Sequence, residues 1–371
     1  MRVRPPAIVL FFAVIVSGFS IPGFAQPAPV RVAIVGLEHG HVAGFLQQFP
    51  SQHDAELVGI VDPDPALRTK YQQQFHLEPG LFYASIDELF AHTQPQALLV
   101  YTSIAQHRRV IEAAAAHNVT VMVEKPLTLS LEDALAIRRV AREHHIRVLV
   151  NYETTWYPSN HAVQSLLREG RLGDIRKVII HDGHQGPKEI GVQPEFLRWL
   201  TDPAQDGAGA LYDFGCYGAD LMTWLMNGAT PMSVTAVAQT DKPDLYPHVD
   251  DDATIILRYR RAQAVLMPSW DWTFARKDTE VYGTKGYAIA VNPTQIRERV
   301  AESSPEVALG IPPMSPPNDT SLHYLAAVLR GQLDPDHDLT SLDTNMVVMQ
   351  ILDAARQSAR TGKTITLHPL P

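Results

Sequence analysis

The N-terminal half of the chain alternates short, continuously apolar segments with segments of helical periodicity. The apolar runs are rich in β-branched residues and lack the polar residue at every second position that a strand with one solvated face would show. Such runs form parallel strands in a sheet that helices cover on both faces, so we expect a doubly wound α/β domain over residues 30–150. The predicted strands span residues 30–35, 56–61, 97–101, 119–123 and 147–150, and the predicted helices span residues 42–49, 66–75, 87–91, 105–117 and 130–144.

The chain changes character after residue 150. Predicted strands now follow one another without regular helices between them, which is typical of a largely antiparallel sheet. Residues 151–371 therefore form a second, α+β domain. Its predicted strands span residues 177–181, 232–239, 253–259, 264–270 and 279–282, its predicted helices span residues 161–169, 217–226, 322–330 and 342–361, and residues 304–318, with five prolines, are expected to form an extended surface loop.

The first 25 residues have the layout of an export signal. Arginines at positions 2 and 4 precede an apolar run at 7–19 and small residues at 23 and 25. This order is typical of a cleavable signal peptide, and the apolar run is shorter than the about 20 residues that a spanning helix needs. We expect cleavage after Ala25, a periplasmic or secreted protein and no stable membrane insertion. An N-terminal membrane anchor is the alternative.

Composition narrows the possible functions. The chain carries 31 Lys and Arg against 40 Asp and Glu, a formal charge of −9, which gives no electrostatic attraction for a nucleic acid. No nucleic-acid partner is therefore expected. Cys216 is the only cysteine, so an intrachain disulfide is impossible and the fold depends on its buried core.

The turn after the first predicted strand departs from the glycine pattern of dinucleotide sites. In G-x-G-x-x-G the glycines would fall at positions 36, 38 and 41, where the chain has Gly36, Glu38 and His41. The helix N-terminus after such a turn attracts phosphate, but Glu38 would repel it unless the carboxylate turned away or met a cation. Asp62, at the end of the second strand, is placed to accept hydrogen bonds from ribose hydroxyls; alternatively, it is a turn residue before Pro63.

The sequence Glu124-Lys125-Pro126 directly follows the fourth predicted strand. A residue at the carboxyl end of a strand in an open parallel sheet faces the ligand crevice, so Lys125 is the strongest candidate for chemistry. Histidine and carboxylate clusters at 38–41, 181–184 and 248–252 contain metal-ligand atoms without a standard ligand spacing, so no metal is expected.

Three segments resemble those of the glucose-fructose oxidoreductase, inositol dehydrogenase and rhizopine-catabolism (Gfo/Idh/MocA) family. They are residues 102–126, which include His107, an alanine-rich helix and the closing EKP, residues 207–220 (GAGALYDFGCYGAD) and residues 282–286 (YGTKG). The resemblance implies a Rossmann domain joined to an open-faced antiparallel sheet, with NAD, or NADP, along the crevice. The chain departs from the family pattern in the turn glycines and in lacking the arginine that commonly stands three residues before Pro158.

The resemblance also implies roles for individual residues. Lys125 would contact the substrate hydroxyl and the nicotinamide ribose, Asp213 would orient the substrate, and Tyr217 would take the position of a catalytic histidine. Lys125 would lower the pKa of the Tyr217 phenol so that the two share the departing proton, unless Tyr217 is an ordinary packed helix residue. Trp156 and Trp199 are candidates for stacking on a sugar ring, with core packing as the alternative. The expected cofactor-binding residues are Gly36, His39, His41, Asp62, Thr102, His107, Glu124, Lys125 and Asn151, and the expected substrate-binding residues are Lys125, Trp156, Trp199, Asp213 and Tyr217.

Together these features predict an exported oxidoreductase that transfers hydride between NAD(P) and a hydroxyl of a sugar, cyclitol or glycoside. Because free nicotinamide nucleotide is scarce outside the cytoplasm, the cofactor is expected to stay bound, and NAD is preferred because Asp62 would face a 2′-phosphate. Two alternatives stay open: an NAD-dependent glycosidase of the same fold, and a binding protein that has lost turnover. Apolar residues on both faces of the second sheet predict a homodimer or homotetramer, unless the helix at 342–361 covers the exposed face.

Overall fold

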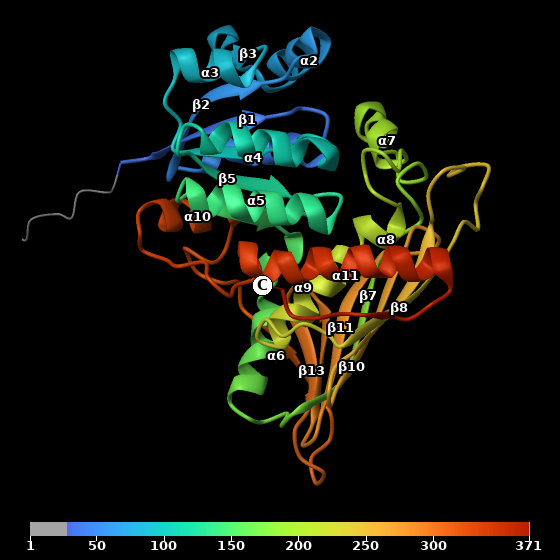
Figure 1. The fold of residues 1–371 in the computed structure, drawn as a ribbon. Helices are drawn as coiled ribbons and strands as arrows, with labels where there is room; N and C mark the ends of the chain where they lie inside the picture. Colours follow the sequence, from blue (N-terminus) through green and yellow to red (C-terminus); the bar gives the residue numbers. More distant parts are fainter. Residues whose placement is uncertain (1–27, 371) are drawn as a thin grey trace, which may run out of the picture.

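The computed structural model describes residues 28–370, and the predicted signal peptide at 1–25 lies outside the described residues. The chain folds into two sheets, one in each half of the sequence, with helices packed on both (Figure 1). Within residues 28–370, no helix is both long and apolar enough to cross a membrane.

The N-terminal sheet is the doubly wound parallel sheet that the sequence predicts. Its strand order is β3-β2-β1-β4-β5-β6, and every neighbouring pair is parallel. The chain direction across the sheet reverses between β1 and β4, and ligands of such sheets bind at this switch point. The strands are β1 (Val30–Val35), β2 (Ala55–Val61), β3 (Phe82–Tyr83), β4 (Ala97–Val100), β5 (Thr120–Glu124) and β6 (Val148–Asn151), and the helices are α1 (His41–Gln48), α2 (Pro65–Phe75), α3 (Ile86–His92), α4 (His107–Ala115) and α5 (Leu131–Glu143).

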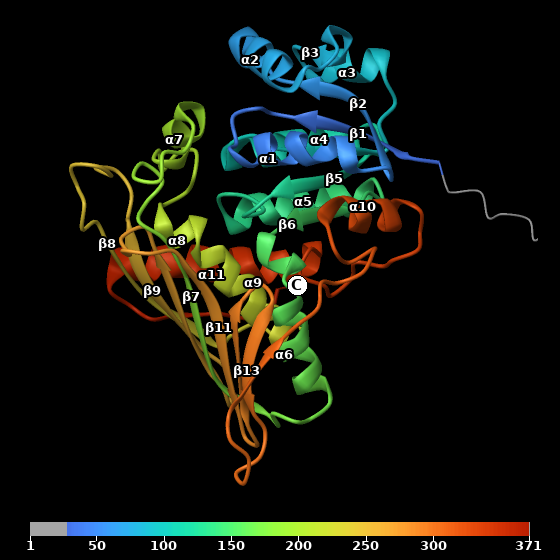
Figure 2. The ribbon, with the colours of Figure 1, turned by 180° about the vertical axis from the view of Figure 1, so that it is seen from behind.

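Both faces of this sheet are buried, and one of them is completed by a segment from the far end of the chain. Alternate residues of β4 enter different cores: Leu98 and Val100 join the core of α4 and α5, whereas Ala97 and Leu99 join that of α1 and α10 (Ser321–Leu329). Figure 1 shows α4 and α5 in front of the sheet, and Figure 2 shows α1 and α10 on the opposite face. The first domain therefore includes a helix that the sequence-based boundary after residue 150 placed in the second.

The second sheet has nine strands in the order β14-β13-β12-β11-β7-β10-β9-β8-β15. It is largely antiparallel as predicted, but β7 and β10 are parallel. The expected loop at 304–318 was wrong in part, because Val307–Gly310 pairs with β13 as an edge strand. The strands are β7 (Ile175–Gly183), β8 (Ser233–Gln239), β9 (Asp252–Arg258), β10 (Gln263–Ser269), β11 (Arg276–Gly283), β12 (Tyr287–Asn292), β13 (Gln295–Arg299), β14 (Val307–Gly310) and β15 (Ile365–Thr366), and the remaining helices are α6 (Pro158–Arg168), α7 (Pro194–Leu200), α8 (Ala210–Asp213), α9 (Gly215–Leu225) and α11 (Leu342–Thr361).

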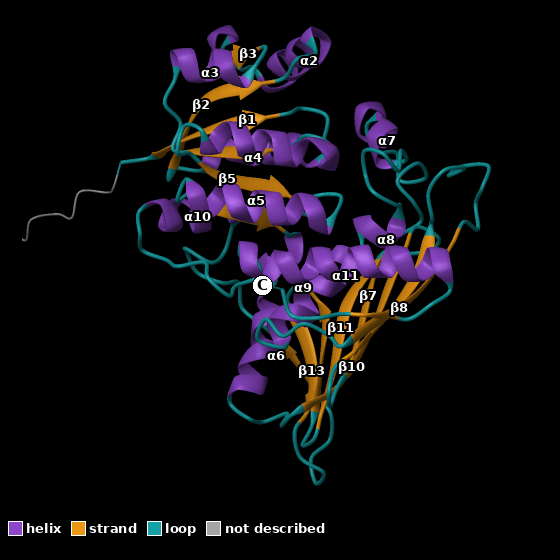
Figure 3. Cartoon of the chain, viewed as in Figure 1, coloured by secondary structure: helices purple, strands orange, loops and turns teal. Residues whose placement is uncertain are grey.

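Helix α11 has the bounds that its sequence signals predict and lies across the second sheet (Figure 3). The Ser341 hydroxyl caps its first turn by accepting from the Thr344 N–H, and the helix ends at Gly362, whose φ is +65°. The backbone N–H of Ala236 on β8 donates to the Ser358 hydroxyl at 2.9 Å, which fixes the helix on the sheet.

The two faces of this sheet differ in their covering. Ile255 and Leu266, on the face of α9 and α11, are buried, whereas their chain neighbours Ile256 and Val265 on the other face are partly exposed. Helix α11 therefore covers one face, and the opposite face keeps partly exposed apolar side chains.

Candidate active site

The turn after β1 brings two strands of the first sheet into close contact. Gly36 has a φ of +90°, which L-residues rarely adopt, and a Cβ there would lie 2.6 Å from Thr102 Cγ2. The turn therefore requires glycine at this position. It leads into α1, whose first residue is His41.

Asp62, at the end of β2, stabilises this turn through hydrogen bonds. Its carboxylate oxygens accept hydrogen bonds from the backbone N–H groups of Leu37, at 2.7 Å, and of Asp64, at 2.8 Å. Burial raises the pKa of the Asp62 carboxyl, and these two hydrogen bonds offset only part of that rise. Each Asp62 oxygen thus accepts one hydrogen bond that holds the turn. Each oxygen has a further lone pair, so the predicted hydrogen bond to a ribose hydroxyl stays possible.

Glu38, which replaces the second glycine of the pattern, is held by donors from the loop after β4. Its Oε1 accepts from the Ser103 N–H at 2.7 Å and from Gln106 Nε2 at 2.8 Å. The Glu38 carboxylate is therefore hydrogen-bonded within the protein, and the repulsion of a phosphate expected from its position is reduced.

A pocket of about 580 Å³ lies between this turn, the end of β2 and α7, and Gly36, Asp62 and Thr102 line it. Helix α7 stands apart from the second sheet and reaches the first domain (Figure 1). Its Trp199 donates through Nε1 to the Glu38 carbonyl at 3.3 Å, and its ring centroid is 5.4 Å from that of His39. The structure thus places Trp199 at the first turn, whereas the sequence assigned it to the substrate.

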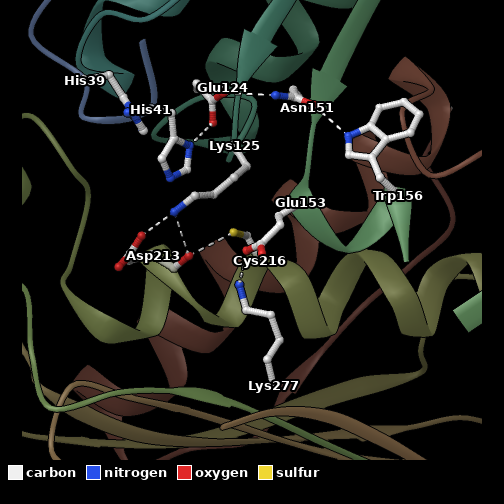
Figure 4. Close-up of polar contacts among 10 residues, drawn as sticks. All are labelled: His39, His41, Glu124, Lys125, Asn151, Glu153, Trp156, Asp213, Cys216 and Lys277. Atoms are coloured by element: carbon white, nitrogen blue, oxygen red, sulfur yellow. Dashed lines mark hydrogen bonds and ion pairs between the residues drawn. The ribbon is translucent and has the colours of Figure 1, made fainter. Parts of the chain in front are cut away.

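The carboxyl end of β5 delivers Lys125 to a buried ion pair with Asp213 of α8 (Figure 4). Lys125 Nζ also donates to the Asp213 carbonyl at 3.1 Å, and Trp270 Nε1 donates to Asp213 Oδ2 at 2.9 Å. Burial would lower the pKa of Lys125 and raise that of Asp213, but their mutual attraction outweighs it, so the pKa of Lys125 is raised and that of Asp213 is lowered. Both groups are therefore charged at neutral pH.

Glu124 begins a hydrogen-bonded chain beside this pair (Figure 4). Its Oε2 lies 2.9 Å from His41 Nδ1, and its Oε1 accepts from Asn151 Nδ2 at 3.0 Å. Asn151 Oδ1 in turn accepts from Trp156 Nε1 at 3.1 Å, and the Trp156 ring packs edge-on against Tyr324. The structure therefore brings together three predicted cofactor residues, and it ties Trp156 to them.

Two histidines of the predicted cofactor set are buried and neutral. His107 Nδ1 lies 3.2 Å from the Leu127 carbonyl, and burial lowers its pKa to about 4, so it supports the segment after Lys125. His39 Nδ1 accepts from the His41 N–H at 3.2 Å, and burial also lowers its pKa. The proton of neutral His39 therefore sits on Nε2, which is buried and has no hydrogen-bond partner in the described chain.

Tyr217, on α9, has two lysine ammonium groups near its ring. Lys277 Nζ is 4.1 Å and Lys125 Nζ is 5.2 Å from the ring centroid. Burial, followed by the charges of Asp182 and Glu153, raises the pKa of the Tyr217 phenol well above its ordinary value. This direction is opposite to the one expected from Lys125, because burial and the nearby carboxylates raise the pKa and the phenol stays protonated.

Sequence reasoning missed three charged residues on the floor of the site. Lys277 of β11 bonds to Glu153 Oε2 at 2.8 Å and lies 3.6 Å from Asp182 Oδ1 of β7. Asp182 was weighed only as part of a metal cluster, and Lys277 carries no motif. The available signal was strand alternation, which puts Asp182 on the buried face with Val178 and Ile180.

Three side chains near Lys125 offer metal-ligand atoms: those of His39, His41 and Glu124 lie within 4.8 Å of one another. His41 and Glu124 are hydrogen-bonded to each other, and His39 Nδ1 is occupied by a backbone N–H. We therefore assign no metal to this cluster.

A parallel sheet with a glycine turn and a pocket at its switch point, and with a buried lysine–carboxylate pair at the same carboxyl edge, is typical of nucleotide-dependent oxidoreductases. Two family models match the chain: an oxidoreductase family with an NAD-binding Rossmann fold over residues 30–152, and the GFO/IDH/MocA C-terminal domain over residues 160–289. The chain belongs to the Gfo/Idh/MocA family of NAD-binding oxidoreductases, as its motifs predict.

Curated relatives and solved structures agree with this family. Trans-1,2-dihydrobenzene-1,2-diol dehydrogenase of Xenopus tropicalis is 24% identical over 311 residues, which cover 82% of this chain and 90% of the relative. An aldose-aldose oxidoreductase from Caulobacter crescentus, complexed with glycerol, matches with a TM-score of 0.78 at 22% identity and covers 91% of this chain and 100% of its own. An inositol dehydrogenase homolog from Azotobacter vinelandii, complexed with NAD+, matches with a TM-score of 0.78 at 21% identity over 91% of this chain and 97% of its own.

Proposed function

We propose that this protein transfers hydride between a tightly held NAD and a hydroxyl group of a sugar or cyclitol. The observation that carries the proposal is the charged, buried Lys125–Asp213 pair at the carboxyl end of β5, the same edge of the parallel sheet that the pocket of the first turn borders. A positioned ammonium group donates to a substrate oxygen and stabilises the negative charge that develops on it as hydride leaves.

The pocket fits a dinucleotide despite its altered turn. His39 Nε2 is a buried donor without a partner in the described chain, next to the N-terminus of α1, and suits a phosphate oxygen. Arg109 and Arg198 line the pocket itself, which His39 does not, and neither arginine is ion-paired within residues 28–370, so both can offset phosphate charge. We therefore assign phosphate contacts to His39, Arg109 and Arg198, in place of the missing glycines.

The site's own residues position the substrate around the cofactor, which supplies hydride exchange at its nicotinamide ring when bound. Lys125 holds the reacting oxygen, Asp213 keeps Lys125 charged, and Trp270 orients Asp213. Glycerol and myo-inositol, the compounds bound in two structural neighbours, and the dihydrodiol in the relative's name all carry adjacent hydroxyls. We therefore expect a substrate with vicinal hydroxyls.

Contacts around α7 support a cofactor that stays bound. Glu195 of α7 pairs with Lys70 at 2.5 Å, and the Gln205 side chain and carbonyl accept from Ser103 Oγ and the Ala105 N–H. These bonds tie the α7 segment to the first domain, so one wall of the pocket is fixed. A bound cofactor also suits the export that the N-terminal residues predict.

Mass spectrometry of the purified, heat-denatured mature protein tests this proposal. We expect release of NAD at close to one equivalent per chain, and reduction of the bound nicotinamide when an aldose or myo-inositol is added to the native protein. A protein that releases no nucleotide and fails to bind added NAD would overturn the proposal.

We expect NAD to bind at least about tenfold more tightly than NADP, a difference of about 1.4 kcal/mol. The end of the pocket near β2 is lined by Asp62, Asp64 and Asp87, which would repel a 2′-phosphate. Calorimetric titration of the cofactor-free protein with both nucleotides gives the ratio, and tighter binding of NADP would contradict the assignment.

Tyr217→Phe is expected to slow hydride transfer roughly tenfold, the effect of losing one hydrogen bond of about 1.4 kcal/mol. Because the pKa of the phenol is raised, its loss should leave the pH profile unchanged below about pH 9. Tyr212→Phe is the matched control, since the Tyr212 hydroxyl donates to the Leu129 carbonyl at 3.0 Å, away from the lysines. Equal loss of rate in both variants would make the role of Tyr217 structural.

A homo-oligomer is the expected state of the mature protein, because the face of the second sheet that carries Ile256 and Val265 keeps apolar side chains partly exposed. Light scattering at micromolar concentration should give a mass of two or four chains, and Val265→Glu should lower it. A single-chain mass for the unmodified protein would refute the oligomer.

A further inference from the structure

A second large cavity lies in the second domain, at the end that is remote from Lys125. Its volume is about 730 Å³, against about 580 Å³ for the pocket of the first turn. Its walls come from the last turns of α6 and α9, the start of β7, the segment before β8 and the turn between β9 and β10. Figures 1 and 2 show α6 running away from the first domain toward this end.

The cavity and the Lys125 site lie at opposite ends of shared elements. Strand β7 begins at the cavity with Ile175 and ends at Gly183, beyond Asp182 on the floor of the Lys125 site. The nine residues of β7 rise about 3.3 Å each, so its ends lie roughly 26 Å apart. Helix α9 likewise carries Tyr217 near its start and Leu225, a cavity residue, at its end. The cavity is therefore separate from the nucleotide pocket and from the Lys125 site.

Apolar side chains form much of the cavity wall. Leu167 comes from α6, Leu225 and Met226 come from the end of α9, and Met232 precedes β8. Small-molecule sites are typically cavities of roughly 300–1,000 Å³ with mainly apolar walls and a few polar groups. The size and the wall of this cavity therefore suit a small molecule with an apolar body.

Four exposed arginines line the same cavity: Arg168, Arg176, Arg260 and Arg261. Asp174 is the acidic residue among the lining side chains, and its Oδ2 lies 3.7 Å from Arg176 Nη2. The other three arginines have no ion pair within residues 28–370. A cluster of unpaired guanidinium groups on a chain with a formal charge of −9 attracts an anion to this place.

The turn between β9 and β10 holds two of these arginines in place. The Tyr259 N–H donates to the Ala262 carbonyl at 2.9 Å, which closes the turn around Arg260 and Arg261. Arg176 Nη1 donates to the Arg261 carbonyl at 3.4 Å and ties the turn to the start of β7. The guanidinium groups of Arg260 and Arg261 thus project from a backbone that is fixed at both sides.

Two buried polar side chains of the wall lack partners. Gln164 and Tyr259 are each 6% exposed. The Tyr259 hydroxyl has no hydrogen-bond partner in the described chain, and the Gln164 amide makes no hydrogen bond to any part of residues 28–370. Leaving such groups unpaired costs stability. A polar ligand group in the cavity supplies a partner for the Gln164 amide.

We propose that this cavity binds a small amphipathic anion, a carboxylate with an aliphatic or aromatic body. The apolar body lies against Leu167, Met226 and Met232, and the carboxylate pairs with the guanidinium groups of Arg260 and Arg261. This second site goes beyond the proposed hydride transfer and does not depend on it.

The shape of the cavity favours a free small molecule over a membrane surface. Docking on a lipid surface needs apolar side chains that project outward. Of the large apolar residues that are exposed within residues 28–370, Met232 alone lines the cavity, whereas the other apolar lining residues are more enclosed. A ligand that enters the cavity reaches them, and a flat membrane surface does not.

Fluorescence of 1-anilinonaphthalene-8-sulfonate, an anion with an aromatic body, tests the proposal on the protein saturated with NAD, which occupies the other large pocket. We expect the probe to bind with a blue-shifted emission that saturates at one probe per chain. Decanoate should displace it. Decanol, which has the same apolar chain without the charge, should displace it at least about tenfold less effectively, because it makes no charge-assisted hydrogen bonds to the arginines.

Two sets of variants locate the site. Met232→Glu places a carboxylate on the wall and should bind the probe at least about tenfold more weakly than Met232→Gln, which has the same size without the charge. Arg260→Gln/Arg261→Gln should also weaken binding about tenfold or more. All three substituted positions are exposed, so the melting temperature should stay that of the wild type.

Arg139→Gln/Arg360→Gln is the matched control, because it removes two exposed arginines that lie outside the cavity. It should leave probe binding unchanged. Unchanged affinity in both Met232→Glu and Arg260→Gln/Arg261→Gln, or an equal loss in the control, would overturn the site. Failure of decanoate to displace the probe, combined with cosedimentation of the protein with phosphatidylglycerol vesicles, would replace the small-molecule site by a membrane contact.

Discussion

Lys125→Met should reduce hydride transfer by about 10²-fold or more while the protein keeps its fold and most of its affinity for NAD. Methionine preserves the stem of the side chain but removes the ammonium group that holds the substrate oxygen. Without Lys125, burial dominates the Asp213 carboxyl and raises its pKa, so Asp213 takes a proton rather than remaining as an unpaired charge. Single-turnover reduction of bound nicotinamide and release of NAD on denaturation measure the two quantities separately.

Lys285→Met is the control for this substitution, because Lys285 is exposed and lies outside the site. It should leave both quantities unchanged. Activity of Lys125→Met within a few-fold of the wild type would remove Lys125 from the reaction.

Asp213→Asn should cost about 3–5 kcal/mol of stability, because it leaves the buried Lys125 ammonium without its carboxylate partner. It should also create a basic limb in the pH profile. In the wild type the raised pKa keeps Lys125 charged across the neutral range; in the variant burial lowers that pKa, so the rate falls as the pH rises through the new value. Denaturant unfolding and the pH–rate profile test the two effects.

The double variant Lys125→Met/Asp213→Asn separates the ion pair from each group alone. Removing both charges leaves no unpaired ion, so it should be more stable than Asp213→Asn, and the two stability losses should not add. Additive losses would mean that the groups do not interact in solution. The rate of the double variant should equal that of Lys125→Met.

Much of the first domain could be predicted from sequence because its signals are local. Continuous apolar runs placed the parallel strands, and the turn at Gly36 and the strand end at Lys125 followed from their order. The pairing of Lys125 with Asp213 was expected from the family resemblance alone, since they lie 88 positions apart and no periodicity connects them.

The missed features depend on contacts between distant segments. Residues 295–299 read QIRER, with one apolar side chain, so only pairing with β12 shows them to be a strand. The hydrogen bonding of the Glu38 carboxylate depends on the Ser103 N–H, which belongs to the loop after β4. The direction of the Tyr217 pKa shift depends on burial, which a motif does not report.

The late position of α10 has a consequence for how the chain is made. Every strand of the first sheet has been synthesised once residue 151 is added, but the α10 residues Leu322 and Leu325, which share a core with Val32 and Ile34, follow near the end of translation. A nascent chain therefore carries an incomplete N-terminal core for most of its synthesis. Final consolidation of that domain therefore waits for the last part of the chain, and we expect a fragment ending at residue 151 to expose apolar surface and aggregate.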